Sequence, residues 1–63
     1  MDMANIREAI KQHLKDKGIS LSAFAAECGM EQASLWRFVN GKTGLSGDNL
    51  LKVLGRLPKK AIG

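Results

Sequence analysis

Six of the seven glycines, at positions 18, 29, 41, 44, 47 and 55, divide this chain of 63 residues into segments of helical length. Within these segments apolar residues recur at helical spacing, and the alternating runs bounded by hairpin turns that would indicate strands are missing. The second segment gives the clearest pattern, a single apolar stripe of Leu21, Phe24, Ala25 and Cys28. We therefore expect an all-α protein, a compact four- to five-helix bundle.

Polar residues at the segment starts predict where the helices begin. Asn5 with Glu8 three residues later fits a capping box, and Ser20 and Ser46 are good N-cap residues for the second and fourth helices. Gly18 and Gly29 predict the ends of the first and second helices, and Gly41 begins the turn after the third. The third and fourth helices are expected over about residues 31–40 and 47–56. We expect one domain over residues 1–57, followed by a short basic tail or an extra helical turn over residues 58–63, which begin with Pro58.

The spacing also predicts which side chains are buried. His13 lies at the edge of the apolar face of the first helix and Cys28 lies on the stripe of the second, so both are interpreted as packed side chains rather than as a ligand or a nucleophile. The fourth helix is expected to have a broad apolar face of Leu50, Leu51, Val53, Leu54 and Leu57. The first helix is expected to bury Ile6, Ala9, Ile10, His13 and Leu14 and to keep Arg7, Glu8, Lys11 and Lys15 away from the core.

The size and composition of the chain exclude several classes of protein. One cysteine permits no intrachain disulfide, and one histidine leaves no Cys/His cluster for a structural zinc. About sixty residues rarely build a preorganised catalytic pocket with its supporting shell, so we expect no enzyme, no catalytic residues and no cofactor. No apolar run is long enough to cross a membrane, and the first residues lack the layout of a signal peptide, so a cytosolic protein is the default expectation.

The basic charge is confined to the second half of the chain. Ten Lys and Arg against six Asp and Glu give a formal net charge of +4. Residues 1–32 hold four basic and five acidic side chains, a net charge of −1, whereas residues 33–63 hold six basic and one acidic side chain, a net charge of +5. Such an asymmetry predicts a polyanionic partner, although a solvated surface with a basic tail remains the alternative.

Two short helices separated by a four-residue turn fit the pattern of a helix-turn-helix, whose second helix enters the major groove of DNA. Gly29 permits the turn, Ala25 is small where the helices approach, and Leu35 and Phe38 lock the second helix in place. The opposite face of that helix carries side chains that an idle surface would not have. These are Ala33, Trp36, Arg37 and Asn40.

Residues 19–57 resemble the lambda-type repressor and Cro helix-turn-helix family, also called xenobiotic-response-element-like proteins. The stretch SLSAFAAECGMEQASLWRFVNGK and the following LSGDNLLKVLGRL carry the resemblance. The chain departs from the family pattern at Leu21, where glutamine is common, at Trp36, where a polar residue is more common, and in a fifth helix reduced to LPKKAIG. The resemblance implies a lambda repressor-like bundle with a central helix-turn-helix.

The resemblance further implies a sequence-specific regulator that binds double-stranded DNA, most simply a phage, plasmid or bacterial repressor that occupies an operator as a homodimer. No small-molecule ligand is expected. Glu31 and Ser34 would lie at the margin of its reading surface. The implied base contacts are Gln32, Ala33, Trp36 and Arg37. The implied phosphate contacts are Ser20, Ser22, Asn40, Lys42 and Thr43.

A second hypothesis is a protein-interaction module of antitoxin or inhibitor type. Aromatic and arginine side chains also dominate protein–protein hot spots, so Trp36 and Arg37 would serve such a surface equally well. A third hypothesis, a basic amphipathic peptide on a membrane, is disfavoured because the apolar faces are divided among short, capped helices.

Overall fold

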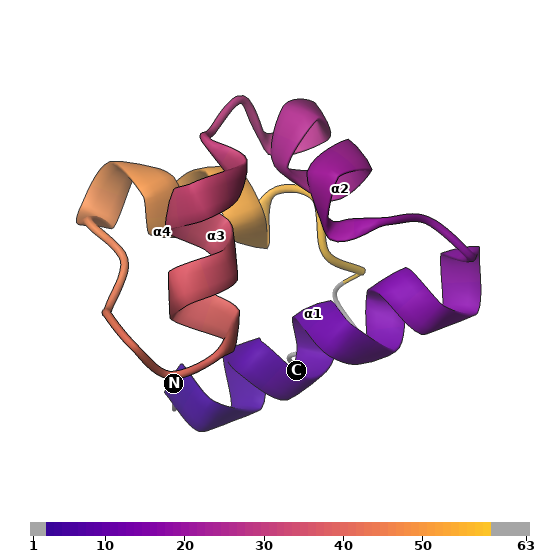
Figure 1. The fold of residues 1–63 in the computed structure, drawn as a ribbon, viewed down its shortest axis with the longest axis horizontal. Coiled ribbons are helices and arrows are strands. Elements are labelled where there is room, and N and C mark those ends of the chain that lie inside the picture. Colours follow the sequence, from indigo (N-terminus) through magenta and orange to yellow (C-terminus); the bar gives the residue numbers. More distant parts are fainter. Residues whose placement is uncertain (1–2, 59–63) are drawn as a thin grey trace.

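Four helices and no strand make up residues 3–58, the part of the chain that this computed structural model describes (Figure 1). The predicted all-α class is therefore confirmed. The expected basic tail or extra helical turn over residues 58–63 lies outside the described residues except for Pro58. The helices are α1 (Met3–Lys17), α2 (Leu21–Cys28), α3 (Gln32–Val39) and α4 (Gly47–Leu54).

Two serine caps begin helices where the sequence predicts them. The Ser20 hydroxyl oxygen accepts from the backbone N–H of Ala23 at 3.1 Å, and the Ser46 hydroxyl oxygen accepts from that of Asn49 at 3.3 Å. Such a bond satisfies an N–H group that has no partner within the helix, which is worth about 1 kcal/mol. The starts of α2 and α4 are thus determined locally.

The predicted start of α1 is wrong. Asn5 lies inside the helix, which extends back to Met3, and Glu8 pairs with Lys11 at 3.7 Å instead of closing a capping box. An exposed Asn inside a helix costs only about 0.7 kcal/mol relative to Ala. The longer helix adds residues before the turn of α1 that contains Ile6, whose side chain is fully buried. Tertiary packing therefore outweighs the capping preference of Asn5.

Gly29 and Gly41 end α2 and α3 in the left-handed conformation, each with a φ of 73°. After α2, the N–H of Met30 donates to the carbonyl of Ala25 at 3.0 Å, and after α3 the N–H of Lys42 donates to the carbonyl of Arg37 at 2.8 Å. These are the bonds of a Schellman motif, in which glycine takes a positive φ without steric cost. Both predicted helix ends are confirmed.

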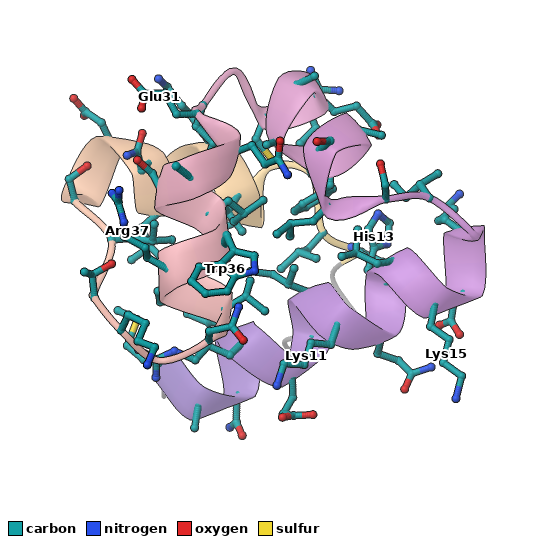
Figure 2. The ribbon with its side chains drawn as sticks, viewed as in Figure 1. Lys11, His13, Lys15, Glu31, Trp36 and Arg37 are labelled. Carbon is teal, nitrogen blue, oxygen red and sulfur yellow. The ribbon has the colours of Figure 1, made fainter. Side chains whose placement is uncertain are left out.

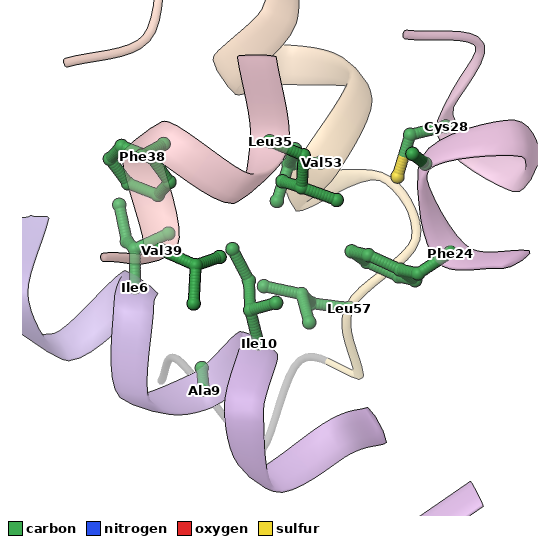
Figure 3. Packing of buried hydrophobic residues seen from close by; sticks show 11 residues of the cluster. Ile6, Ala9, Ile10, Phe24, Cys28, Leu35, Phe38, Val39, Val53 and Leu57 are labelled. Carbon is green, nitrogen blue, oxygen red and sulfur yellow. The ribbon is translucent and has the colours of Figure 1, made fainter. Parts of the chain in front are cut away.

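The core lies between the four helices, and the segment after α4 adds Leu57 to it (Figure 3). Burying a large apolar side chain fully contributes about 1.5–3 kcal/mol. Among the described residues no polar or charged residue is buried, so the polar side chains are at least partly exposed to solvent. The buried side chains are Ile6, Ala9, Ile10, Phe24, Ala25, Cys28, Leu35, Phe38, Val39, Val53 and Leu57.

His13 and Cys28 are packed side chains, as predicted. The half-buried His13 ring meets Phe24 edge-on, with ring centroids 5.3 Å apart. Burial raises the pKa of the Cys28 thiol, an effect that Arg56 opposes and Glu27 reinforces. A buried thiol with a raised pKa is a weak nucleophile, because the thiolate is the reactive form.

The predicted apolar face of α4 is wrong at Leu51, whose side chain is 70% exposed. Val53 and Leu57 are buried and Leu50 and Leu54 are half-buried, as expected. Residues two apart on a helix point in nearly opposite directions, so the burial of Val53 turns Leu51 outward. The described part of the molecule therefore exposes a large apolar side chain on α4.

Candidate nucleic-acid interface

The structure places α2 and α3 as a helix-turn-helix (Figure 1). Residues 29–31 make the turn, one residue fewer than the four expected. α3 packs against both α2 and α1. Leu35 and Phe38 are fully buried and Ala25 is 1% exposed, so these three side chains belong to the core on which α3 rests. Because the buried side of α3 is packed into the core, the orientation of its exposed side is fixed relative to the rest of the fold.

The outer side of α3 carries the four predicted base-contacting residues. Gln32, Ala33 and Arg37 are exposed, and Trp36 retains 49% of its surface in solvent. Figure 2 shows Trp36 and Arg37 projecting from α3, with Glu31 at its start. Glu31 is exposed and Ser34 is half-buried. The predicted residues thus share one accessible helix face, which combines an indole ring, a guanidinium and a side-chain amide.

Ser20 and Ser22 lie exposed at the start of α2. The Ser20 oxygen accepts the capping bond from Ala23, but its hydroxyl hydrogen is not needed for that bond. A serine hydroxyl can donate to a phosphate oxygen while it caps a helix. The start of α2 therefore combines two hydroxyl donors with the positive end of the helix dipole.

Three further predicted residues lie in the post-α3 segment, residues 40–43, all of which are exposed. The side-chain amide nitrogen of Asn40 donates to the carbonyl of Trp36 at 2.9 Å. That bond occupies one of the two amide hydrogens and leaves the other, together with the ammonium of Lys42 and the hydroxyl of Thr43, facing solvent. The segment offers several hydrogen-bond donors and one positive charge.

Arg7 belongs to this region, although the sequence pattern placed it on the solvent side of α1. Its side chain is half-buried, with the guanidinium carbon 4.7 Å from the centre of the Phe38 ring. Its Nε donates to the Phe38 carbonyl at 2.7 Å and its terminal nitrogen reaches the Thr43 carbonyl at 3.5 Å. Arg7 is the one arginine among the basic residues of α1, and that was the signal available, because arginine suits stacked and forked contacts better than lysine.

The positive charge of the second half of the chain is only partly at this interface. Arg37 and Lys42 lie on α3 and in the post-α3 segment, whereas Lys59 and Lys60 lie outside the described residues. Arg56 lines a separate cleft of about 510 Å³ together with Lys17 and Glu27, at the ends of α1 and α2. The basic residues of the second half of the chain therefore lie at more than one place on the surface.

Residues 3–58 hold neither a cluster of metal-ligating side chains nor a membrane-spanning helix. No group of three or more His, Cys, Asp or Glu side chains there is arranged to hold a metal ion. No helix of this part is long and apolar enough to span a membrane.

Comparison with known proteins identifies the family. The model of the family described as HTH_3, Helix-turn-helix, matches residues 10–61, which is most of the chain. Neither the curated proteins nor the solved structures gave a match. The match agrees with the resemblance to Cro and lambda repressor proteins and with the arrangement of α2 and α3. It indicates DNA binding of the transcription-regulator type. The chain belongs to the helix-turn-helix family.

Proposed function

We propose that the protein is a transcriptional repressor that binds a specific operator in double-stranded DNA as a homodimer, with α3 in the major groove. The observation that carries this proposal is the exposed face of α3, because Trp36 and Arg37 project from a helix whose other side is locked by buried Leu35 and Phe38. A rigidly held helix can place side chains at base edges reproducibly.

Each residue on that face has a chemically suitable base partner. Arg37 can donate two hydrogen bonds to guanine, and Gln32 can bond adenine through both amide atoms. The methyl group of Ala33 and the indole of Trp36 suit the methyl group of thymine or the sugar. Each good bidentate pair discriminates against a wrong base by about 1–3 kcal/mol. Four residues of this kind are enough to read a short half-site.

Phosphate contacts are assigned to the two ends of the helix-turn-helix. Ser20 and Ser22 would contact one phosphate at the start of α2, and Asn40, Lys42 and Thr43 another beyond the end of α3. These residues are exposed and hold donors that the fold does not use. Phosphate contacts set the register of the helix on the duplex, and base contacts provide the sequence preference.

Dimer formation is proposed because one domain of this size makes few contacts with DNA. Leu51 supports α4 as the surface of association, since this apolar side chain is 70% exposed. In a dimer, the two recognition helices would lie about 34–36 Å apart, one turn of the duplex. Occupation of an operator in the cytoplasm, at the nucleoid, would block access of polymerase.

The proposed function is tested by selecting bound sequences from a pool of random double-stranded DNA. The expected result is an enriched palindromic motif with half-sites about ten base pairs apart, and an affinity that falls steeply as salt rises. Failure to enrich any motif would contradict the proposal. A motif without symmetry would contradict the dimer while retaining the reading of sequence by α3.

Trp36 also favours one alternative, a module that captures a protein partner. A half-exposed tryptophan beside an arginine has the composition of a protein hot spot. The variants Gln32→Ala and Arg37→Ala separate the two functions. If both variants bind DNA as the wild type does but lose a protein partner, the alternative is correct and the repressor proposal is wrong.

A further inference from the structure

We propose that Arg7 is a positioning residue for DNA binding. It holds the post-α3 segment against α1, so that Asn40, Lys42 and Thr43 offer their donors to one phosphate. This inference rests on the proposed function and adds to it a residue on α1, outside the helix-turn-helix.

The contact between Arg7 and Phe38 combines a hydrogen bond with a cation–π interaction. The Nε–H donates to the Phe38 carbonyl at 2.7 Å, a short bond typical of a charged donor. The same carbonyl accepts from the N–H of Gly41 at 3.0 Å, in the motif that ends α3. The guanidinium also lies over the Phe38 ring, at 4.7 Å from its centre. Arg7 on α1 therefore donates a hydrogen bond to a carbonyl at the C-terminal end of α3. Its positive charge there is favourable, because this end of the helix dipole is negative.

The second contact reaches across the post-α3 segment. The terminal nitrogen of Arg7 lies 3.5 Å from the Thr43 carbonyl, a longer and weaker hydrogen bond than the one to Phe38. Asn40 and Lys42 lie between these two carbonyls in the chain. One guanidinium thus spans the segment in which the proposed phosphate donors lie.

Few other bonds hold this segment. Within residues 3–58, Gly41, Lys42 and the Asn40 side chain bond only to carbonyls of α3 itself. Arg7 connects the segment to α1 directly through its bond to Thr43 and indirectly through its bond to Phe38 at the end of α3. The segment is exposed on all four residues, so packing adds little to fix its position. Removal of the guanidinium should therefore loosen the segment and leave the buried core in place.

The test compares Arg7→Met and Arg7→Lys with Lys15→Met, measured on the operator selected by the wild type. Lys15 is exposed on the same helix, so its variant loses an equal charge without touching α3. We expect the dissociation constant to rise about tenfold in both Arg7 variants and less than about twofold in Lys15→Met, at unchanged helical circular dichroism. Lysine should not rescue binding, because it keeps the charge but lacks the planar fork. Rescue by lysine would reduce the role of Arg7 to charge alone and overturn the proposal.

A double-mutant cycle with Lys42→Ala tests whether Arg7 acts through the segment. In the wild-type background, Lys42→Ala should weaken binding severalfold and lower the salt dependence by about one ion. In the Arg7→Met background the same change should have little further effect. Additive effects would overturn the proposal.

Amide hydrogen exchange provides a readout that does not require DNA. The amides of Gly41 and Lys42 should exchange faster in Arg7→Met and in Arg7→Lys, while amides of the buried stretch of α2 stay protected. Unchanged exchange at both amides would overturn the positioning role. If the wild type selects no DNA sequence, the proposed function fails; if the wild type binds its operator and the Arg7 variants bind equally well, this inference alone fails.

Discussion

The side-chain amide of Asn40 is bonded to the carbonyl oxygen of Trp36 at 2.9 Å, and the Asn40 backbone N–H reaches the same oxygen at 3.0 Å. Two residues proposed to face DNA are thereby linked to each other at the end of α3. The amide of Asn40 is held in one orientation by this bond. An oriented donor loses less conformational entropy on binding than a free one.

Asn40→Ala should therefore weaken binding to every DNA sequence by a similar factor. The lost contact is a phosphate contact, so we expect a reduction of about 1 kcal/mol in binding free energy, equally on operator and on random DNA. Competition binding with both DNAs measures the two losses. A selective loss on the operator would show that Asn40 reads a base instead.

Ser20→Ala should destabilise the fold by about 1 kcal/mol, because the N–H of Ala23 loses its capping acceptor. Ser22→Ala is the matched control, since Ser22 is exposed within the same helix and makes no such bond; its effect should stay within about 0.5 kcal/mol. Urea denaturation of the two variants measures the difference. Equal stability of both would disprove a stabilising role for the cap.

Leu51→Lys should weaken dimer formation and leave the stability of the folded monomer unchanged. Because Leu51 is 70% exposed, its replacement removes little core packing, and the free energy of unfolding of the monomer should change by less than about 0.5 kcal/mol. A charge on the proposed dimer surface should nevertheless weaken cooperative binding to two half-sites. Sedimentation of the protein–DNA complex gives the stoichiometry. A variant that still binds as a dimer with wild-type affinity would place the interface elsewhere.

The buried thiol of Cys28 should lower the free energy of unfolding at alkaline pH. Burial raises its pKa above the ordinary value of 9.0 in the folded protein, and no such increase applies to the unfolded chain. As the pH rises through the unfolded value, the unfolded state releases the thiol proton first, so the free energy of unfolding falls. The decline above about pH 9 should be smaller in Cys28→Ala than in the wild type. Parallel declines in denaturation series at several pH values would contradict this account.

Local chemistry made much of the fold predictable. Ser20, Ser46 and Gly29 act on the residues next to them, so their caps and turn could be predicted without knowing the tertiary structure. The start at Asn5 could not, because candidate helix starts differ by less than about 1 kcal/mol and packing decides between them. Leu51 was misplaced because α4 is short and the burial of Val53 determines its rotation.

The candidate site was likewise predictable only where it depends on residues close together in the sequence. The face of α3 followed from helical periodicity once Leu35 and Phe38 were identified as its buried side. The role of Arg7 did not follow, since its contact to Phe38 joins residues 31 positions apart and only the packing of α1 against α3 brings them together. The contacts of Gln32, Ala33, Trp36 and Arg37 with DNA stay predictions.

Sequence reading by α3 is tested most directly by a base-pair scan of the selected operator with Arg37→Ala. Affinities of the wild type and the variant are measured on operators changed at one base pair at a time. The wild type should lose about 1–3 kcal/mol at a particular G·C pair in each half-site, and Arg37→Ala should lose that discrimination while keeping it at the other positions. If the variant weakens binding equally on every operator, or keeps the preference for that G·C pair, α3 does not read sequence through Arg37 and the account is contradicted.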